Sequence, residues 1–158
     1  MEIKKGSRKT LKEAEMAIFR VASLATGIDI VSIGRMRAAA QRERFCERVF
    51  TGAELVYSRK KRAPHKHLAG RFAAKEACVK ALSRAGDAAL RGLHPWRWTD
   101  IEVVNEKDGS PAFLLHAAAA KALKGRKVFL SITYSKGLHP RQGLALAIAV
   151  IEGVAPRA

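Results

Sequence analysis

The segment LAGRFAAKEACVKAL, residues 68–82, decides the fold that this sequence predicts. Drawn at 100° per residue, its larger apolar side chains fall on one stripe, as in a helix that buries one face against a core. These side chains are Leu68, Phe72, Val79 and Leu82. Because Pro64 can occupy the first turn of a helix, we expect the helix to run from about His65 to Arg84.

Charged residues border this apolar stripe on both sides. Glu76 and Lys80, four residues apart, lie along one border, whereas Arg71 and Lys75 lie towards the other. Lys75 also intrudes into the apolar arc. A Glu–Lys pair at this spacing is by itself a common helix stabiliser, worth roughly 0.2–0.5 kcal/mol. The charges indicate a functional site only if another segment supplies a matching group.

Such a group stands in the apolar run Val21–Ile33, which we expect to form the first strand. By the two-residue period of a strand, Asp29 projects on the side opposite to Ile28 and Ile30. A carboxylate in so apolar a run costs several kcal/mol if it is buried unpaired, so it needs hydrogen-bond donors or a cation. One interpretation is an aspartate bonded to nearby amides at a strand edge; the other is a functional carboxylate.

The rest of the chain predicts an α+β single domain with a mainly antiparallel sheet and three consecutive helices after the first strand. A capping box, TGAE at residues 51–54, marks the start of the middle helix, and KDGS at residues 107–110 marks a hairpin turn. The expected helices are residues 35–49, 52–62, 65–84 and 117–124, with strands at 99–106, 111–116, 127–135 and 144–152. Residues 1–20 form an extension with a short helix at 11–20, residues 21–153 form the domain, and 154–158 are a tail.

The composition and charge indicate which kind of partner and which cellular location to expect. The chain has 158 residues and a formal charge of +16, and residues 35–71 alone hold 11 basic and 3 acidic side chains. This excess favours a polyanionic or acidic partner. Cys46 and Cys78 are too few for a disulfide framework, and no apolar run approaches the ~18 residues of a membrane span. We expect a cytoplasmic protein with no membrane segment.

The strand carboxylate and the helix glutamate suggest phosphate chemistry if the fold brings them together. Asp29 and Glu76 would then offer hard oxygen ligands to Mg²⁺, which binds one or two carboxylates together with water and a phosphate oxygen. Lysines and arginines on the same helix would contact phosphate groups. The sequence therefore predicts metal-assisted phosphoryl transfer without a P-loop.

At these segments the chain resembles the holo-acyl-carrier-protein synthases, the small bacterial 4′-phosphopantetheinyl transferases. The matching motifs occur in family order: GIDIV at residues 27–31 with Arg35 following, RF at 44–45, FTGAEL at 50–55, RFAAKEA at 71–77 with Lys80, DGSP at 108–111 and SIT at 131–133. The sequence departs from the family in its extension of about 20 residues before the first strand, and in Tyr134, where many members have histidine.

The resemblance implies a reaction and a set of roles. The phosphopantetheine arm of coenzyme A passes to a serine of an acidic apo acyl carrier protein, and adenosine 3′,5′-bisphosphate leaves. Asp29 and Glu76 would hold Mg²⁺, with Asp29, Glu76 and Lys80 as the catalytic residues. We expect Glu76 to act as the base, directly or through a metal-bound water. The residues expected at coenzyme A are Arg71, Lys75, Lys80, Gly109 and Pro111; those expected at the carrier are Arg35, Arg42, Arg44 and Arg48. The resemblance also implies a homotrimer with its sites between subunits.

Two other functions stay open on the residues alone. A basic nucleic-acid-binding module would explain the charge, but Trp96 and Trp98 stand isolated and no aromatic-rich strand motif is present for stacking bases. In a scaffold protein, Asp29 and Glu76 would be satisfied internal acids. Binding of coenzyme A that depends on Mg²⁺ separates the enzyme from both alternatives.

Overall fold

The computed structural model describes residues 23–85, 96–137 and 143–154. Its elements in chain order are β1 (Ser23–Ser32), α2 (Ile33–Ala39), α3 (Glu43–Val49), α4 (Gly52–Arg59), α5 (Pro64–Ala85), η2 (Trp98–Asp100), β2 (Ile101–Asn105), β3 (Pro111–Leu115), α6 (Ala117–Leu123), β4 (Val128–Ser135) and β5 (Leu144–Val154). The predicted helix at residues 11–20 lies outside the described residues.

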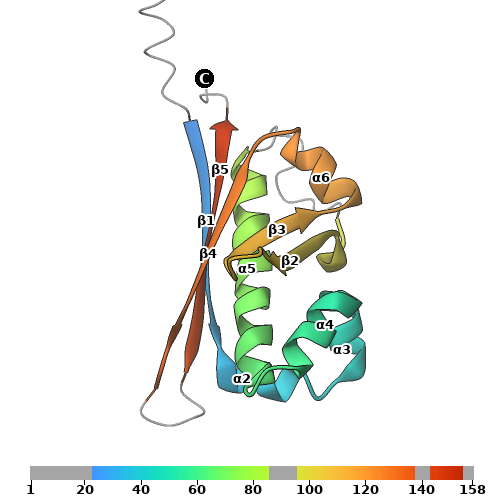
Figure 1. Ribbon diagram of the computed structural model, residues 1–158. Coiled ribbons are helices and arrows are strands. Elements are labelled where there is room, and N and C mark those ends of the chain that lie inside the picture. The colour runs from blue at the N-terminus through green and yellow to red at the C-terminus, as the bar shows by residue number, and fades with distance from the viewer. Residues whose placement is uncertain (1–22, 86–95, 138–142, 155–158) are drawn as a thin grey trace, which may run out of the picture.

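The strands form two antiparallel sheets. Three strands lie in the order β1-β5-β4, and β2 and β3 form a separate hairpin. In the larger sheet Asp29 pairs with Ala147. Helix α5 runs along one face of this sheet, and the smaller helices and the hairpin pack on the other side of α5 (Figure 1). The predicted α+β class with antiparallel sheets is thus confirmed, and α5 is the central element.

Small residues let α5 approach the sheet closely. Ala77 and Ala81 of α5 are completely buried, and Gly27 of β1 lies against their backbone. A Cβ atom at Gly27 would collide with the carbonyl oxygen of Ala77, so only glycine fits this crossing. The strand and the helix are therefore in close contact at Gly27 and Ala77. Gly27 lies two positions before Asp29 in β1, and Ala77 directly follows Glu76 in α5.

The single helix predicted over residues 35–49 is wrong, because the structure has two helices there. Helix α2 ends at Ala39, and α3 begins after Arg42, whose backbone is extended. In one straight helix, Met36 and Val49 would lie ~20 Å apart along the axis. Instead both belong to the same buried cluster. The chain turns between the helices so that both apolar side chains reach one core.

The outer face of the larger sheet is apolar, and no other part of the described residues covers it. Its exposed side chains include Leu24 and Ile30, both 58% exposed, and Ile28 at 54%. Phe129 of β4 and Leu144 of β5 are also exposed. The strand periodicity predicted correctly that Ile28 and Ile30 point away from Asp29. It could not tell that no other segment of the described chain covers them.

Candidate active site

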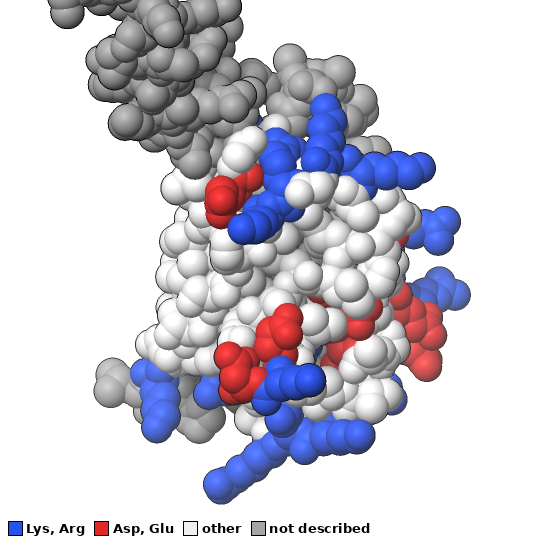
Figure 2. Space-filling model, turned by 45° about the horizontal axis from the view of Figure 1, so that its top comes forward, with Lys and Arg blue, Asp and Glu red and all other residues white. Residues whose placement is uncertain are grey.

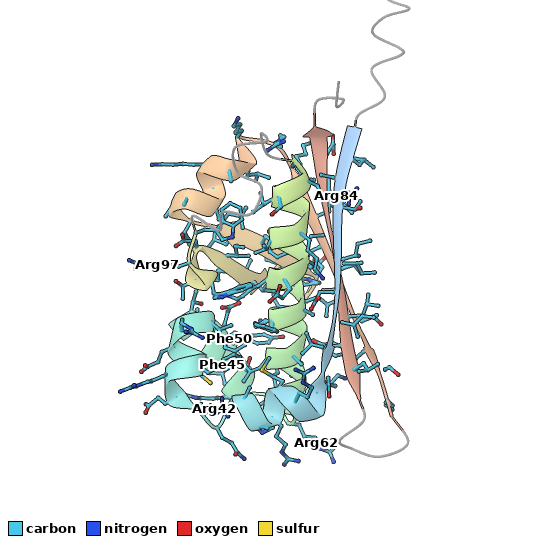
Figure 3. All side chains as sticks on the ribbon, turned by 180° about the vertical axis from the view of Figure 1, so that it is seen from behind. Arg42, Phe45, Phe50, Arg62, Arg84 and Arg97 are labelled. Atoms are coloured by element: carbon cyan, nitrogen blue, oxygen red, sulfur yellow. The ribbon has the colours of Figure 1, made fainter. Side chains whose placement is uncertain are left out.

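Two carboxylates from distant parts of the chain line one cavity. This cavity has a volume of about 670 Å³, and Asp29 of β1 and Glu76 of α5 both line it. Its apolar lining includes Met36, Phe45 and Phe72. Figure 3 shows Phe45 on the same side of the molecule as Arg42, at the end where α2 and α3 lie. The tertiary structure thus brings together the two residues that the sequence proposed as metal ligands.

Lys80 gives Asp29 a cationic partner. The Lys80 Nζ atom lies 2.7 Å from Asp29 Oδ1 and donates a second hydrogen bond to the Ile28 carbonyl oxygen at 2.8 Å. The Lys80 side chain is 49% exposed and that of Asp29 19%. A pair this accessible to water contributes at most about 1 kcal/mol. The ammonium can therefore turn towards a phosphate at little cost.

Glu76 also lines a second cavity, of about 830 Å³, which Asp29 does not line. This cavity includes Lys80, Gly27 and Arg84. Since Glu76 borders both spaces, it stands where a ligand in the second cavity would meet one in the first. The helix spacing of four residues places Glu76 and Lys80 on the same side of α5, as the sequence predicts.

The acidic pair fits the donor set of a magnesium ion. Within the described ranges, no group of three or more histidine, cysteine or acidic side chains could hold a metal ion. Mg²⁺ does not require such a group, because it keeps several waters and binds through one or two carboxylates plus phosphate oxygens. Asp29 and Glu76, partly exposed at an open cavity, match this requirement.

Arg71 lies on another side of α5 and is 4% exposed. Its Nη2 atom donates to Asn105 Oδ1 at 3.0 Å, and its guanidinium carbon lies 3.9 Å from the centroid of the Tyr57 ring. Asn105 Nδ2 in turn donates to the Gly109 carbonyl oxygen. Among the described residues, no group accepts a hydrogen bond from the buried Arg71 Nε. Arg71 is thereby connected to the turn that carries Gly109 and Pro111.

Aromatic rings and cations surround Arg71. The His67 ring contacts both Tyr57 and Tyr134, and the Lys66 ammonium lies 4.5 Å from the Tyr134 ring centroid. Burial lowers the pKa of His67, and the neighbouring Arg71, Lys61 and Lys66 lower it further. Tyr134 packs over Gly70, where a Cβ atom would strike its hydroxyl. The sequence did not predict Tyr57, although its position three residues after Glu54 puts it on the helix face towards α5.

Lys75 is not available to a coenzyme. Its side chain is completely buried, its Nζ atom lies 2.8 Å from Glu54 Oε2, and it donates to the Trp98 carbonyl oxygen at 2.9 Å. Burial lowers the pKa of Lys75, and the Glu54 carboxylate opposes that shift. The expectation that Lys75 contacts coenzyme A phosphates is therefore corrected, because its ammonium points into the protein.

The arginines expected at a carrier protein are all exposed. Arg35 and Arg42 line the 670 Å³ cavity beside Asp29 and Glu76, and Arg44 and Arg48 lie on α3. Figure 2 shows Lys and Arg gathered at two ends of one face, with uncharged residues over the flank between them. The sequence missed the apolar part of the cavity, since Met36, Phe45 and Phe72 come from three helices and only the tertiary structure brings them together.

The fold and this cavity define an α+β protein with an acidic pair, a lysine and a basic rim. A family model described as the 4′-phosphopantetheinyl transferase superfamily matches residues 25–149, a span inside the domain predicted over residues 21–153. The chain therefore belongs to this superfamily of group-transfer enzymes. The resemblance stated from the motifs is confirmed.

Relatives and solved structures agree with this assignment. The chain is 42% identical to a holo-[acyl-carrier-protein] synthase of Clostridium tetani over 134 residues, which cover 82% of this chain and 96% of the relative. It is 36% identical to the Moorella thermoacetica protein of the same name over 133 residues, with 82% and 94% covered. Among solved structures, the "Chronobacterium ammoniagenes ACPS-CoA complex" superposes with a TM-score of 0.63 at 28% identity, covering 83% of this chain and 98% of that one. The Helicobacter pylori holo-[acyl-carrier-protein] synthase in complex with coenzyme A superposes with a TM-score of 0.60 at 29% identity, with 80% and 98% covered.

Among the described helices, none is long and apolar enough to cross a bilayer.

Proposed function

We propose that this chain transfers the 4′-phosphopantetheine group from coenzyme A to a serine of an acidic apo acyl carrier protein, with its catalytic domain at residues 21–153 and its location in the cytoplasm. The observation that carries the proposal is that Asp29 and Glu76 line one cavity whose rim holds Arg35 and Arg42. The relatives named holo-[acyl-carrier-protein] synthase and the coenzyme A complexes among the structural neighbours support the same reaction.

The reaction exchanges one phosphorus–oxygen bond for another. The serine oxygen attacks the β-phosphorus of coenzyme A, and the bond to the leaving adenosine 3′,5′-bisphosphate breaks. In such a transfer, positioning and neutralisation of charge supply most of the catalysis. Mg²⁺ bound to Asp29 and Glu76 would supply charge neutralisation at the pyrophosphate.

The chain's own side chains have separate tasks in this proposal. Lys80, which is half exposed beside Asp29, would turn its ammonium to the phosphate oxygens. Glu76, which borders both cavities, would accept the serine proton as that oxygen attacks phosphorus. Asp29, whose carboxylate lies 2.7 Å from Lys80 Nζ, would bind the metal together with Glu76. Met36 and Phe72 would shield the reacting groups from water on the other side of the cavity.

Three other residues expected at coenzyme A, Arg71, Gly109 and Pro111, lie apart from Asp29 and Glu76. Glu76 follows Arg71 by five positions, which places the two side chains about 140° apart around α5. Arg71, Gly109 and Pro111 also do not line the 670 Å³ cavity. We therefore propose that one coenzyme A contacts Asp29, Glu76 and Lys80 of one subunit and the Arg71 group of the next. Lys75 has no part in this contact.

The uncovered sheet face supports a homotrimer with such shared sites. Contiguous exposed apolar patches of this kind mark interaction sites in soluble proteins, and Ile28 and Phe129 place the patch on both edge strands. We expect light scattering to give about three times the 17.3 kDa chain mass for the wild type. Ile28→Glu should give monomers, because it buries a charge at the contact. Val56→Glu alters an equally exposed apolar residue on α4 and should stay trimeric. A monomeric wild type would contradict the proposal.

Charge reversal at the cavity rim tests the carrier surface. Arg35→Glu and Arg42→Glu should each raise the KM for the carrier about tenfold, because a complementary charge becomes a repelling one. The KM for coenzyme A should change less than twofold. Lys121→Glu makes the same charge change on exposed α6, at the opposite end of the molecule (Figure 1), and should leave both constants at the wild-type value. Equal effects of all three variants would argue against a carrier site at this rim.

Mass spectrometry tests the reaction directly. The purified protein is incubated with Mg²⁺, coenzyme A and a panel of apo carrier proteins, and a phosphopantetheine adds about 340 Da to a carrier. Carriers with the acceptor serine replaced by alanine are the control. We expect a mass increase on at least one wild-type carrier and none with EDTA. If no carrier gains mass, the proposed function is wrong.

A further inference from the structure

A fully buried ion pair connects α5 to three other elements. Glu54 of α4 accepts hydrogen bonds from the backbone N–H groups of Thr51 at 2.8 Å and Val103 at 3.0 Å, and it pairs with Lys75 of α5 at 2.8 Å. Lys75 also donates to the Trp98 carbonyl oxygen of η2. The hydrogen bonds of the two side chains are directional, so together they specify where α5 lies against α4, β2 and η2.

A pair of this kind does not by itself make a protein more stable. The cost of removing two charges from water often equals or exceeds their attraction, and well-packed apolar residues frequently replace such pairs without loss of stability. What apolar residues cannot reproduce is direction, because apolar contacts tolerate rotation. On this side α5 also buries the alanines Ala69, Ala73 and Ala74, which offer few features that resist rotation. Its other directional contact with β2 is the hydrogen bond from Arg71 to Asn105.

The rotation of α5 about its axis decides where Glu76 points. Glu76 follows Lys75 directly, so a rotation that moves Lys75 away from Glu54 turns Glu76 away from Asp29 by the same angle. Active-site groups must be held within about 0.5 Å and 10–20° of their working geometry. On the opposite side, the close contact of Gly27 with Ala77 limits how near the helix lies to β1. Lys80 also hydrogen-bonds to β1 there, but its side chain is half exposed and must leave these partners to reach a phosphate. The buried pair is therefore left to set the angle.

We propose that Lys75, through its pair with Glu54, is a positioning residue that sets the rotation of α5 so that Glu76 faces Asp29 across the cavity. The proposal rests on the proposed function, since it assumes that Asp29 and Glu76 bind the metal together. It assigns Lys75 a task inside the protein, in place of the coenzyme contact that the sequence suggested.

Lys75→Met and Leu82→Ala form a matched pair of variants for the test. Leu82 is 1% exposed on the same helix, and its truncation costs stability without touching the ion pair. In assays below the melting temperatures of both variants, Lys75→Met should lower kcat at least tenfold and raise the Mg²⁺ concentration for half-maximal rate severalfold. Leu82→Ala should keep both within twofold. Binding of Mn²⁺ in the presence of coenzyme A, followed by the electron paramagnetic resonance of free Mn²⁺, should weaken severalfold only in Lys75→Met.

The double variant Glu54→Gln/Lys75→Met separates positioning from stability. It removes both charges and keeps an acceptor for the Val103 N–H, so it should fold even if Lys75→Met does not. We expect its kcat and Mn²⁺ affinity to stay low although its melting temperature recovers. Recovery of activity together with stability, or equal kinetics in Lys75→Met and Leu82→Ala, would overturn the proposal. Glu76→Gln distinguishes failure of the proposed function from failure of the positioning inference. If Glu76→Gln remains active, the proposed site itself is wrong. If it is inactive while Lys75→Met behaves like Leu82→Ala, only the positioning inference is wrong.

Discussion

Replacing Glu76 by glutamine is expected to reduce kcat for phosphopantetheine transfer by about 10³-fold or more. The substitution removes both a metal ligand and the proposed base, and each of these contributes several orders of magnitude in comparable reactions. Asp29→Asn should cause a loss of the same order, since it leaves one carboxylate in the cavity. The melting temperature should change by only a few degrees, because both side chains are partly exposed.

Single-turnover transfer to an apo carrier, followed by mass, measures this loss. Glu152→Gln is the matched control, because it makes the same chemical change at a partly exposed position of β5 that lines neither cavity. It should retain wild-type kcat. A second signature concerns the metal: raising Mg²⁺ tenfold should restore part of the rate in Asp29→Asn if the residue binds metal. Near-normal turnover by either variant would refute the assignment of the site.

The largest effect on stability is expected for Lys75→Met. The substitution leaves the Glu54 carboxylate completely buried without its cation, and loss of one partner from a buried pair costs about 3–5 kcal/mol of unfolding free energy. The midpoint of urea unfolding should fall accordingly at an unchanged slope. Glu54→Gln/Lys75→Met should recover much of this loss, because no unpaired charge remains.

Urea unfolding, followed by circular dichroism, gives the unfolding free energies of Lys75→Met and of Glu54→Gln/Lys75→Met in one series. Lys80→Met is the control, since it removes a lysine of the same helix whose side chain is 49% exposed beside Asp29. Its unfolding free energy should change by less than about 1 kcal/mol. If Lys75→Met were no more destabilising than Lys80→Met, the buried pair would not have the energetic role that its geometry indicates.

Much of the fold could be predicted because the elements carry local patterns. The capping box at Thr51 and Glu54 is present as predicted, with both of its hydrogen bonds. The third predicted helix and the hairpin around Asp108 and Gly109 also agree with the structure to within two residues. The break between α2 and α3 was missed because nothing in residues 35–49 interrupts a helix. The turn there depends on where Met36 and Val49 find their common core.

The candidate site, like the fold, could be predicted only in part from the sequence. The motifs predicted Asp29, Glu76 and Lys80 as site residues. The structure brings Lys80 to Asp29, and Glu76 shares one cavity with each of them. Lys75 was misassigned because a helix wheel shows only which side of its own helix a residue occupies. Glu54 lies 21 positions earlier in the chain, and no local spacing shows that its carboxylate meets Lys75.

The sequence by itself determined the order of the strands and of the helices other than the break between α2 and α3, the family, and which side of its own element each charged residue occupies. These follow from periods of 3.6 and 2 residues and from short motifs, all of which act over a few neighbours. Only the tertiary structure decided which charges face each other: Asp29 meets Lys80 at the surface, whereas Glu54 meets Lys75 in the core. The physical reason is that an ion pair depends on the distance between groups and on their exclusion from water, and both are set by packing between elements.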